Sequence, residues 1–226
     1  MAIAKVVNAT AELCGRDRVF AAHVERTGPC VLRPRLGGRP HFEQLARSIA
    51  FQQLAGKAAS AIWGRVLLLT DGPFTPEAVL SLADADLRGA GLSTNKTLAL
   101  QDLATHVLDG RLPLDRVARQ RDETVIDELT RVRGIGRWTA EMFLMFQLGR
   151  LDVWPVGDLG VRNGYRALYD LAELPTVKEL EIHGDKFSPW RSIAAWYCWR
   201  AADTVVPSDA PRSSSADDDA WGGAKK

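Results

Sequence analysis

Cysteine and histidine are scarce in this sequence and are scattered. Its 226 residues include three cysteines and four histidines, and neither a Cys-x-x-Cys nor a His-Glu-x-x-His pattern occurs. Because a catalytic zinc site needs several ligands at set spacings, we expect no zinc chemistry. An odd number of separated cysteines gives no disulfide framework and favours a reducing compartment.

Long apolar runs and an excess of positive charge are also missing. No run approaches the ~20 apolar residues of a membrane span, and the N-terminus lacks a basic segment leading into an apolar core. We therefore expect a soluble, intracellular protein. The formal net charge is +1, so any affinity for nucleic acid must come from local clusters of basic residues.

Apolar residues recur at helical spacing through most of the chain, and no β alternation is present, so the sequence predicts an all-α fold of about ten helices. Residues 1–28 are predicted to form one helix. The segment from 207 to 226 is rich in serine and aspartate and is predicted to be disordered. Helix starts are predicted where a capping residue precedes a periodic run, namely at Ser93, at Asp158, at Thr75 with Pro76 and at Ser188 with Pro189.

Residues 129–143 carry the most informative pattern. One apolar helix ends near Val132, another begins at Arg137, and Gly134-Ile135-Gly136 lies between them. Two glycines allow a tight turn because glycine accepts positive φ. The first N–H groups of the second helix have no partner within it, and with the helix dipole they form an anion site. Three arginines crowd this turn, so we expect the anion to be a nucleic-acid phosphate; they are Arg131, Arg133 and Arg137.

Three further motifs accompany this hairpin. They are Phe51-Gln-Gln-Leu-Ala-Gly-Lys-Ala58 upstream, and Val153-Trp-Pro-Val-Gly-Asp-Leu-Gly-Val161 and Ser188-Pro-Trp-Arg-Ser192 downstream. In this order the four motifs resemble the helix-hairpin-helix DNA glycosylase superfamily, and within it the 3-methyladenine DNA glycosylase II type. The resemblance implies two helical lobes with the hairpin at the mouth of the cleft between them. Residues 42–150 would form a central lobe with the wedge and hairpin, and residues 1–41 with 151–206 a second lobe carrying the catalytic aspartate.

Asp158 is the candidate catalytic residue. It follows Gly157 at a predicted helix start, where N–H groups and the dipole keep a carboxylate ionised. Taken alone, the same pattern fits a capping aspartate without catalytic duty. The resemblance implies catalysis, because cleavage of the N-glycosidic bond builds positive charge on the deoxyribose. A fixed carboxylate stabilises that charge and orients or deprotonates the attacking water.

Trp138 stands where relatives that also cut the DNA backbone carry a nucleophilic lysine. The resemblance therefore implies a monofunctional enzyme that leaves an abasic site. It also implies a base pocket formed by Trp138, Met142 and Trp190, in which indole faces attract cationic purines such as 3-methyladenine and 7-methylguanine. Met142 lies one turn beyond Trp138, where the family often has an aromatic residue, and this leaves the substrate range open. Trp154 is expected to be structural.

The resemblance also assigns the residues that would contact DNA. Gln53 and Leu54 match the wedge that fills the place of the extruded base, although a leucine is by default a core residue. The phosphate-binding set comprises Arg133, Gly134, Ile135, Gly136, Arg137 and Thr139. Arg133 replaces a proline common in the family, and we expect it to loosen the turn slightly.

The expected partner is double-stranded DNA containing alkylated bases, bound by a monomer with no membrane association. We expect no cofactor. No cysteine cluster follows the hairpin, which excludes the iron–sulfur cluster of some relatives. In the family a monovalent cation, Na⁺ or K⁺, often bridges the hairpin to DNA through main-chain carbonyls, here those of residues 132–136. The compartment would be the bacterial cytoplasm or nucleoid, or the nucleus of a eukaryote.

Two other functions remain open: a helix-hairpin-helix DNA-binding protein without catalysis, and a glycosylase for mismatched or other damaged bases. The motif around Asp158 and the wedge favour an enzyme, because a binding protein needs neither. The missing lysine and cysteines disfavour the second alternative.

Overall fold

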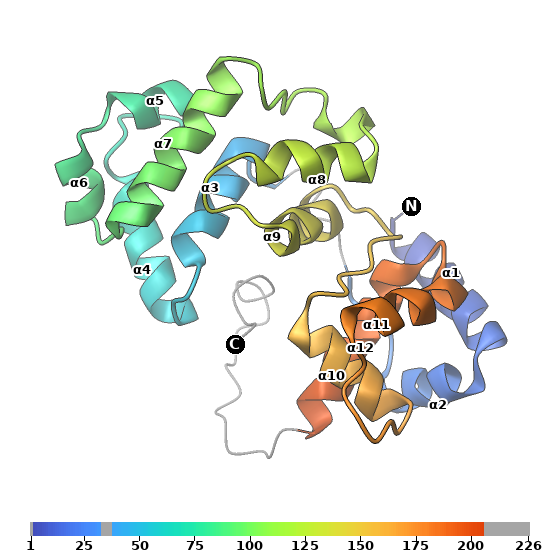
Figure 1. Cartoon of the computed structure of the whole chain (residues 1–226). Helices are drawn as coiled ribbons and strands as arrows, with labels where there is room; N and C mark the ends of the chain where they lie inside the picture. Colours follow the sequence, from blue (N-terminus) through green and yellow to red (C-terminus); the bar gives the residue numbers. More distant parts are fainter. Residues whose placement is uncertain (1, 33–37, 206–226) are drawn as a thin grey trace. The chain divides into compact units, whose positions relative to one another are not determined.

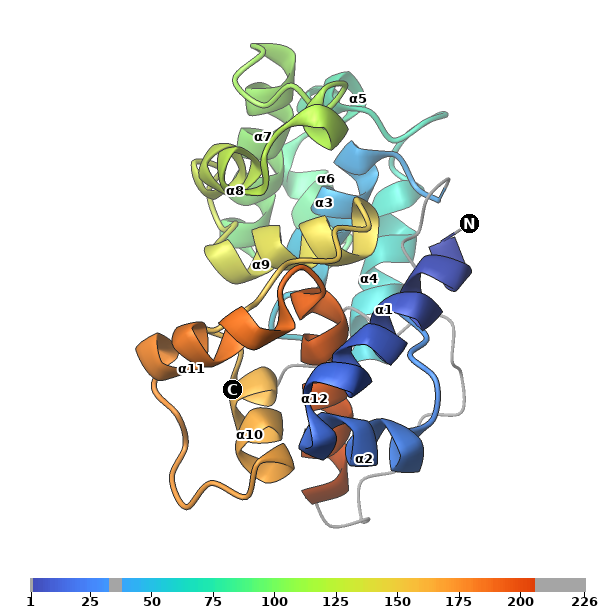
Figure 2. The ribbon, with the colours of Figure 1, turned by 90° about the vertical axis from the view of Figure 1, so that its right-hand side faces the viewer.

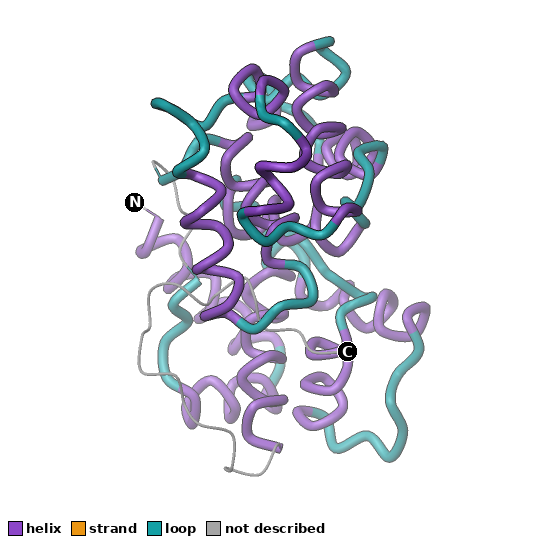
Figure 3. The backbone as a smooth tube through the Cα atoms, turned by 90° about the vertical axis from the view of Figure 1, so that its left-hand side faces the viewer, coloured by secondary structure: helices purple, strands orange, loops and turns teal. Residues whose placement is uncertain are grey.

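The structure is a computed structural model that describes residues 2–32 and 38–205. Every regular element in these ranges is a helix, as the tube drawing shows (Figure 3). The predicted all-α class is therefore confirmed, with twelve α-helices among the described residues where about ten were expected. No helix in the described part of the chain is long and apolar enough to span a membrane.

The described residues divide into two units (Figure 1). Residues 38–143 form the central unit, and residues 2–32 with 144–205 form the terminal unit. The lobe boundaries and the cleft drawn from the resemblance stay predictions. The predicted disorder of residues 207–226 lies outside the described residues.

In the central unit α7 (Thr94–Leu108) packs against three other helices, α3 (His41–Phe51), α5 (Pro76–Ser81) and α6 (Asp84–Gly89). The unit also holds α4 (Gly56–Leu67), the 3-10 turn η1 (Val117–Arg119), and the hairpin pair α8 (Asp122–Thr130) and α9 (Arg137–Met142). Nearly every residue of α3 is buried, so this helix forms much of the core. Two of the predicted caps are confirmed here: Thr75 and Ser93 each accept an N–H from the first turn of the following helix.

The terminal unit is built around α12 (Arg191–Val205), which lies along α10 (Leu159–Leu168) and also contacts α1 (Ala2–Arg16) and α2 (Arg18–Thr27) (Figure 2). A π-helical turn, η2 (Phe143–Gln147), follows α9 in the chain. The remaining elements are α11 (Val177–Gly184) and the 3-10 turn η3 (Asp185–Phe187).

The contact between α10 and α12 depends on Gly164. A Cβ added there would lie 1.7 Å from the carbonyl oxygen of Cys198, so no larger residue fits without moving a helix. Cys198 is completely buried at this contact, and burial raises the pKa of its thiol. This cysteine therefore packs as a small apolar residue and is not reactive.

Two predicted boundaries are wrong. Within the segment predicted as one helix, residues 2–27 form two helices, because Asp17 ends the first and caps the second, its Oδ1 accepting the N–H of Phe20 at 3.0 Å. Asp17 also accepts hydrogen bonds from Tyr169 and Lys186, which tie this break to the rest of the terminal unit. Ser188 does not cap the last helix, since it ends η3 and α12 begins only at Arg191.

Candidate active site

Asp158 is the N-cap of α10, as the sequence predicted. Its Oδ1 accepts the N–H of Val161 at 2.7 Å, and the side chain is buried, with 3% of its surface exposed. A carboxylate at the positive end of a helix dipole, bonded to a first-turn N–H, is stabilised in its ionised form. The geometry thus provides a fixed carboxylate at this position. A fixed carboxylate is consistent both with a purely capping aspartate and with a catalytic one.

Trp199 of α12 is the partner of Asp158 that the sequence reasoning missed. Its indole Nε1 donates to the same Oδ1 at 2.9 Å, and its ring stacks on Phe146, with centroids 6.0 Å apart. A Cβ on Gly160 would lie 2.9 Å from the Trp199 ring, so the glycine after Leu159 makes room for it. The apolar pattern of α12 concealed this role, because Trp199 there resembles any other core-facing residue.

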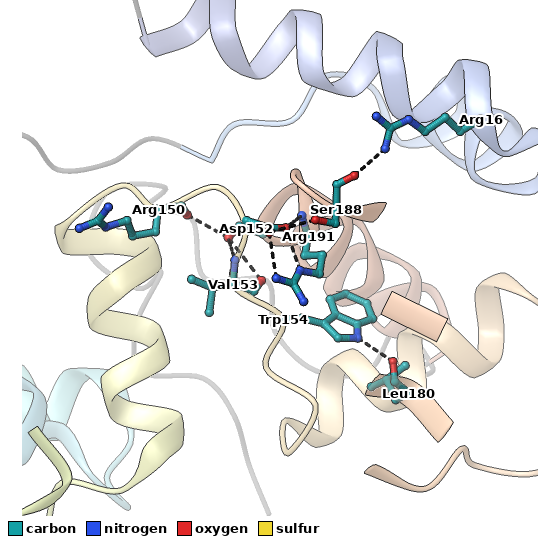
Figure 4. A network of polar contacts seen from close by, with 9 residues as sticks. Arg16, Arg150, Asp152, Val153, Trp154, Leu180, Ser188 and Arg191 are labelled. Carbon is teal, nitrogen blue, oxygen red and sulfur yellow. Dashed lines mark hydrogen bonds and ion pairs between the residues drawn. The ribbon is translucent and has the colours of Figure 1, made fainter. Parts of the chain in front are cut away.

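The loop that leads to Asp158 is fastened to the start of α12 (Figure 4). Ser192 accepts the N–H of Val153 at 2.9 Å and donates to the Arg150 carbonyl at 2.9 Å. Arg191 forms a two-pronged ion pair with Asp152, both contacts 2.8 Å long. The downstream motif Ser188–Ser192 therefore holds the aspartate-bearing loop in place.

Trp154 is structural, as expected from the sequence. Its indole N–H donates to the Leu180 carbonyl at 2.7 Å, and its ring is buried against Gly184, where a Cβ would lie 2.4 Å from it (Figure 4). The ring therefore fixes the loop to α11.

Trp190, one of the predicted pocket residues, is half-buried beside α1. Its indole N–H donates to Glu12 at 2.8 Å, and the Lys5 ammonium lies 5.7 Å from the ring centroid. Arg16 bonds the same Glu12 and also the Ser188 carbonyl. Charged residues of the first helix therefore set the orientation of this tryptophan.

The hairpin turn between α8 and α9 uses its two glycines differently. Gly134 has φ +77°, the left-handed conformation that favours glycine, and a Cβ there would approach Ala99 of α7 to 3.2 Å. Gly136 has φ −91° and open space around it, so of the two glycines Gly134 alone uses the positive φ that glycine allows. Ile135 between them is buried and anchors the turn to the core.

The predicted phosphate-binding side chains have different surroundings. The backbone N–H of Arg133 donates to Asp102 at 2.7 Å, and its side chain extends toward Asn95, 3.4 Å away. The Arg137 guanidinium pairs with Glu123 at 2.8 Å and with Glu141 at 3.1 Å, and the bond to Glu123 raises the pKa of Arg137. Thr139 is buried.

The two pocket candidates on α9 lie one turn apart. Trp138 is half-buried, whereas Met142 is buried, with 3% of its surface exposed. The helix period puts both on one face of α9, as predicted. Trp190 and Asp158 belong to the terminal unit.

The wedge candidates follow the end of α3. Gln53 is exposed and has φ +58°, a conformation that is uncommon outside glycine. Leu54 is half-buried and is absent from the apolar core. The core-leucine alternative therefore does not describe this residue.

The hairpin carbonyls were also the predicted cation ligands. The Val132 carbonyl accepts the N–H of Ile135, and the Gly134 carbonyl accepts the Gln52 side-chain amide. A carbonyl oxygen has two lone pairs, so one hydrogen bond leaves it able to coordinate a cation. Among the described residues no group of three or more His, Cys, Asp or Glu side chains could hold a metal ion.

Comparison with known proteins decides the family. Residues 46–189 match the HhH-GPD superfamily of base excision DNA repair proteins. The chain belongs to this superfamily. It is 36% identical over 203 residues to DNA-3-methyladenine glycosylase 1 of Schizosaccharomyces pombe, covering 88% of this chain and 89% of that protein.

Two solved structures are similar to this chain over most of its length. The S. pombe 3-methyladenine DNA glycosylase in complex with abasic DNA has a TM-score of 0.74 and 37% identity, covering 85% of this chain and 95% of that one. A DNA-3-methyladenine glycosidase from Bacillus halodurans has a TM-score of 0.78 and 40% identity, covering 85% and 88%. The resemblance inferred from four motifs is confirmed.

Proposed function

We propose that this chain is a monofunctional DNA glycosylase of base excision repair, which hydrolyses the N-glycosidic bond of alkylated purines in duplex DNA and leaves an abasic site. Its relatives are DNA-3-methyladenine glycosylases that match it over most of both chains. The observation that supports catalysis most strongly is the buried Asp158 carboxylate, held by a helix N-terminus and an indole N–H.

In this proposal Asp158 faces the sugar of the extruded nucleotide. As the bond to the base breaks, positive charge grows on the deoxyribose, and the ionised carboxylate stabilises it without reorganising. The same carboxylate orients water for attack on the sugar carbon and accepts the water proton as the carbon–oxygen bond forms. The departing purine takes the bonding electron pair, which an alkylated, positively charged base accepts readily.

The proposed absence of lyase activity is supported by the residue at position 138. A lyase needs an amine to attack the sugar and form a Schiff base, and Trp138 has none. Trp138, Met142 and Trp190 would instead receive the base, with cation–π attraction of very roughly 0.5–2 kcal/mol for a cationic purine. Because the Trp190 indole N–H donates to the Glu12 carboxylate, the ring of Trp190 becomes more electron-rich and attracts a cation more strongly.

For DNA binding we propose that the hairpin turn, including Gly134, Gly136 and Arg133, grips a backbone phosphate, and that the Gln53 and Leu54 wedge fills the vacated stack. A Na⁺ or K⁺ ion on the hairpin carbonyls would assist this grip, and the hydrolysis itself would need no cofactor. DNA is the partner of the S. pombe relative. We propose that this chain acts as a monomer wherever the genome is housed, in the nucleoid or the nucleus.

The direct test is to incubate the protein with methylated duplex DNA and to measure free 3-methyladenine and 7-methylguanine. We expect both bases to be released, with strands breaking only after alkali. Breaks without alkali would contradict the monofunctional assignment. Binding of DNA without base release would contradict the enzyme and favour a helix-hairpin-helix binding protein.

A further inference from the structure

The wedge loop, residues 52–55, belongs to no helix and depends on other segments to hold its conformation. α3 ends at Phe51, and Gln52, Gln53 and Leu54 follow before α4 begins at Gly56. Gln53 takes the left-handed conformation, which costs a residue with a side chain on the order of 1 kcal/mol. Such a conformation persists only when neighbouring contacts hold it, so the source of those contacts determines how well the wedge is placed.

Lys96 supplies the first contact. From the first turn of α7, its ammonium donates to the carbonyls of Ala50 at 2.8 Å and of Gln52 at 2.7 Å. These carbonyls lie at the C-terminal end of α3, where helix carbonyls lack partners and a cation is stabilised by the dipole. Burial lowers the pKa of this ammonium, in keeping with a charge enclosed by the loop.

Gln52 supplies the second contact. Its side-chain amide donates to the Gly134 carbonyl at 2.8 Å, and so links the residue before the wedge to the turn of the hairpin. This bond crosses 82 positions of sequence between the two elements that are predicted to touch DNA.

The same face of α7 supports the hairpin. Ala99, three residues after Lys96, lies against Gly134, and Asp102, three residues further, accepts the backbone N–H of Arg133 at 2.7 Å. Residues spaced by three and four share one helix face. One stripe of α7 therefore holds the wedge loop at one end and the hairpin turn at the other.

We propose that Lys96 and Gln52 are positioning residues for base extrusion, which fix the distance between the wedge and the phosphate-gripping turn. The proposal rests on the proposed function, because it takes the wedge and the turn as DNA contacts. A wedge can enter the stack only at the nucleotide set by the phosphate that the hairpin holds. Loosening either tie would misplace the wedge and slow extrusion, while the chemistry at Asp158 would stay unchanged.

The test compares two duplexes under single-turnover conditions. In one, 7-methylguanine is paired with cytosine; in the other it faces a tetrahydrofuran abasic analogue, so that no partner base must be separated from it. A 2-aminopurine next to the lesion reports extrusion by its emission. For Lys96→Met and for Gln52→Met we expect the excision rate of the paired lesion to fall on the order of tenfold. This is the effect of losing a hydrogen bond from a charged group, or one that links the wedge loop to the hairpin. The 2-aminopurine emission should also rise more slowly.

The unpaired lesion should be excised by both variants within about twofold of the wild-type rate, the usual range for a substitution that leaves the chemistry alone. That activity also shows that the variants fold. Lys96→Arg keeps a charged donor and should recover most of the paired-lesion rate. Lys178→Met, which removes an exposed lysine on α11, is the control for total charge and should change neither substrate.

Equal losses on both duplexes, or lost excision with normal emission, would overturn the proposal, as would a full paired-lesion rate in both variants. A loss in Lys178→Met as large as that in Lys96→Met would also overturn it. If the wild-type protein released no methylated base, the proposed function would fail, and the emission signal alone would still decide whether Lys96 and Gln52 control extrusion.

Discussion

Trp199 shows how one side chain can position a catalytic group. Its indole N–H and the Val161 N–H converge on the same oxygen of Asp158, which limits how the carboxylate can rotate. Trp199→Phe should keep an aromatic ring next to Phe146 and lose the indole N–H. We expect the single-turnover excision rate to fall about tenfold, the scale of one hydrogen bond to a charged group. Trp196→Phe on the same helix is the control, and an unchanged rate in Trp199→Phe would remove the positioning role.

Arg133 and Arg137 offer a matched comparison within the hairpin. Arg137 is held by Glu123 and Glu141, whereas the Arg133 side chain donates a long, 3.4 Å hydrogen bond to Asn95. Arg133→Ala should weaken DNA binding at all sequences and reduce the slope of log affinity against log salt by about one. Arg137→Ala should change that slope less, because the Arg137 guanidinium is already paired with Glu123 and Glu141 within the protein. Titrations at several salt concentrations measure both, and a larger slope change for Arg137→Ala would contradict the assignment.

The structural roles of individual residues were predicted well where a local sequence pattern indicates them. The cap at Asp158, the Gly134 turn and the structural role of Trp154 follow from the residue and its neighbours in sequence. The bonds from Trp199 to Asp158 and from Lys96 to Gln52 join residues more than 40 positions apart. No periodicity or spacing signals such a pair in a single sequence, because it depends on how helices pack.

At the scale of elements, the α10–α12 contact is the most restrictive. Gly164→Ala would force a methyl group onto the Cys198 carbonyl, and we expect it to lower the free energy of unfolding by about 1–3 kcal/mol or more. Gly64→Ala on α4 is the control, since nothing lies within 4 Å of its Cβ. It should raise stability by about 0.5–1 kcal/mol, through helix propensity. Denaturant titrations of both variants compare them, and equal stability would contradict the packing account.

Element boundaries were harder to predict than element type. Helical periodicity continues through Asp17, so the sequence predicted one helix, yet a capping aspartate there starts a second. Ser188 followed by Pro189 is a common helix start, but here the backbone of Ser188 closes a 3-10 turn and α12 begins three residues later. In both places tertiary bonds decide: Asp17 binds Tyr169 and Lys186, and Ser188 binds Arg16 and Asp152.

At the scale of the whole molecule, both units should lose stability in mild acid. Burial lowers the pKa of His23 in the terminal unit and of His41 in the central unit below the usual 6.5. The unfolded chain therefore binds protons more readily than the folded protein. The stability that His23 and His41 contribute to the folded protein is fully present above pH 6.5. It is lost as the pH falls from 6.5 toward their lowered pKa values.

Unfolding measured from about pH 8 to about pH 5 should show this slope. It should flatten in the double variant His23→Gln with His41→Gln, because neither position then titrates. A slope unchanged by the double variant would show that other groups control the acid response.

The net charge of +1 gave no sign of a DNA-binding protein, and the basic residues of one turn carried that prediction. Four short motifs indicated the superfamily because each combines a local backbone conformation with side chains suited to a particular chemical role.

The central claim is tested most directly by Asp158→Asn on a duplex with a single 7-methylguanine. The amide keeps the size of the side chain and removes its charge. We predict that single-turnover base release falls on the order of a hundredfold or more, the usual cost of losing a preorganised electrostatic contact, while affinity for the duplex is retained. Base release at the wild-type rate in Asp158→Asn would contradict the account.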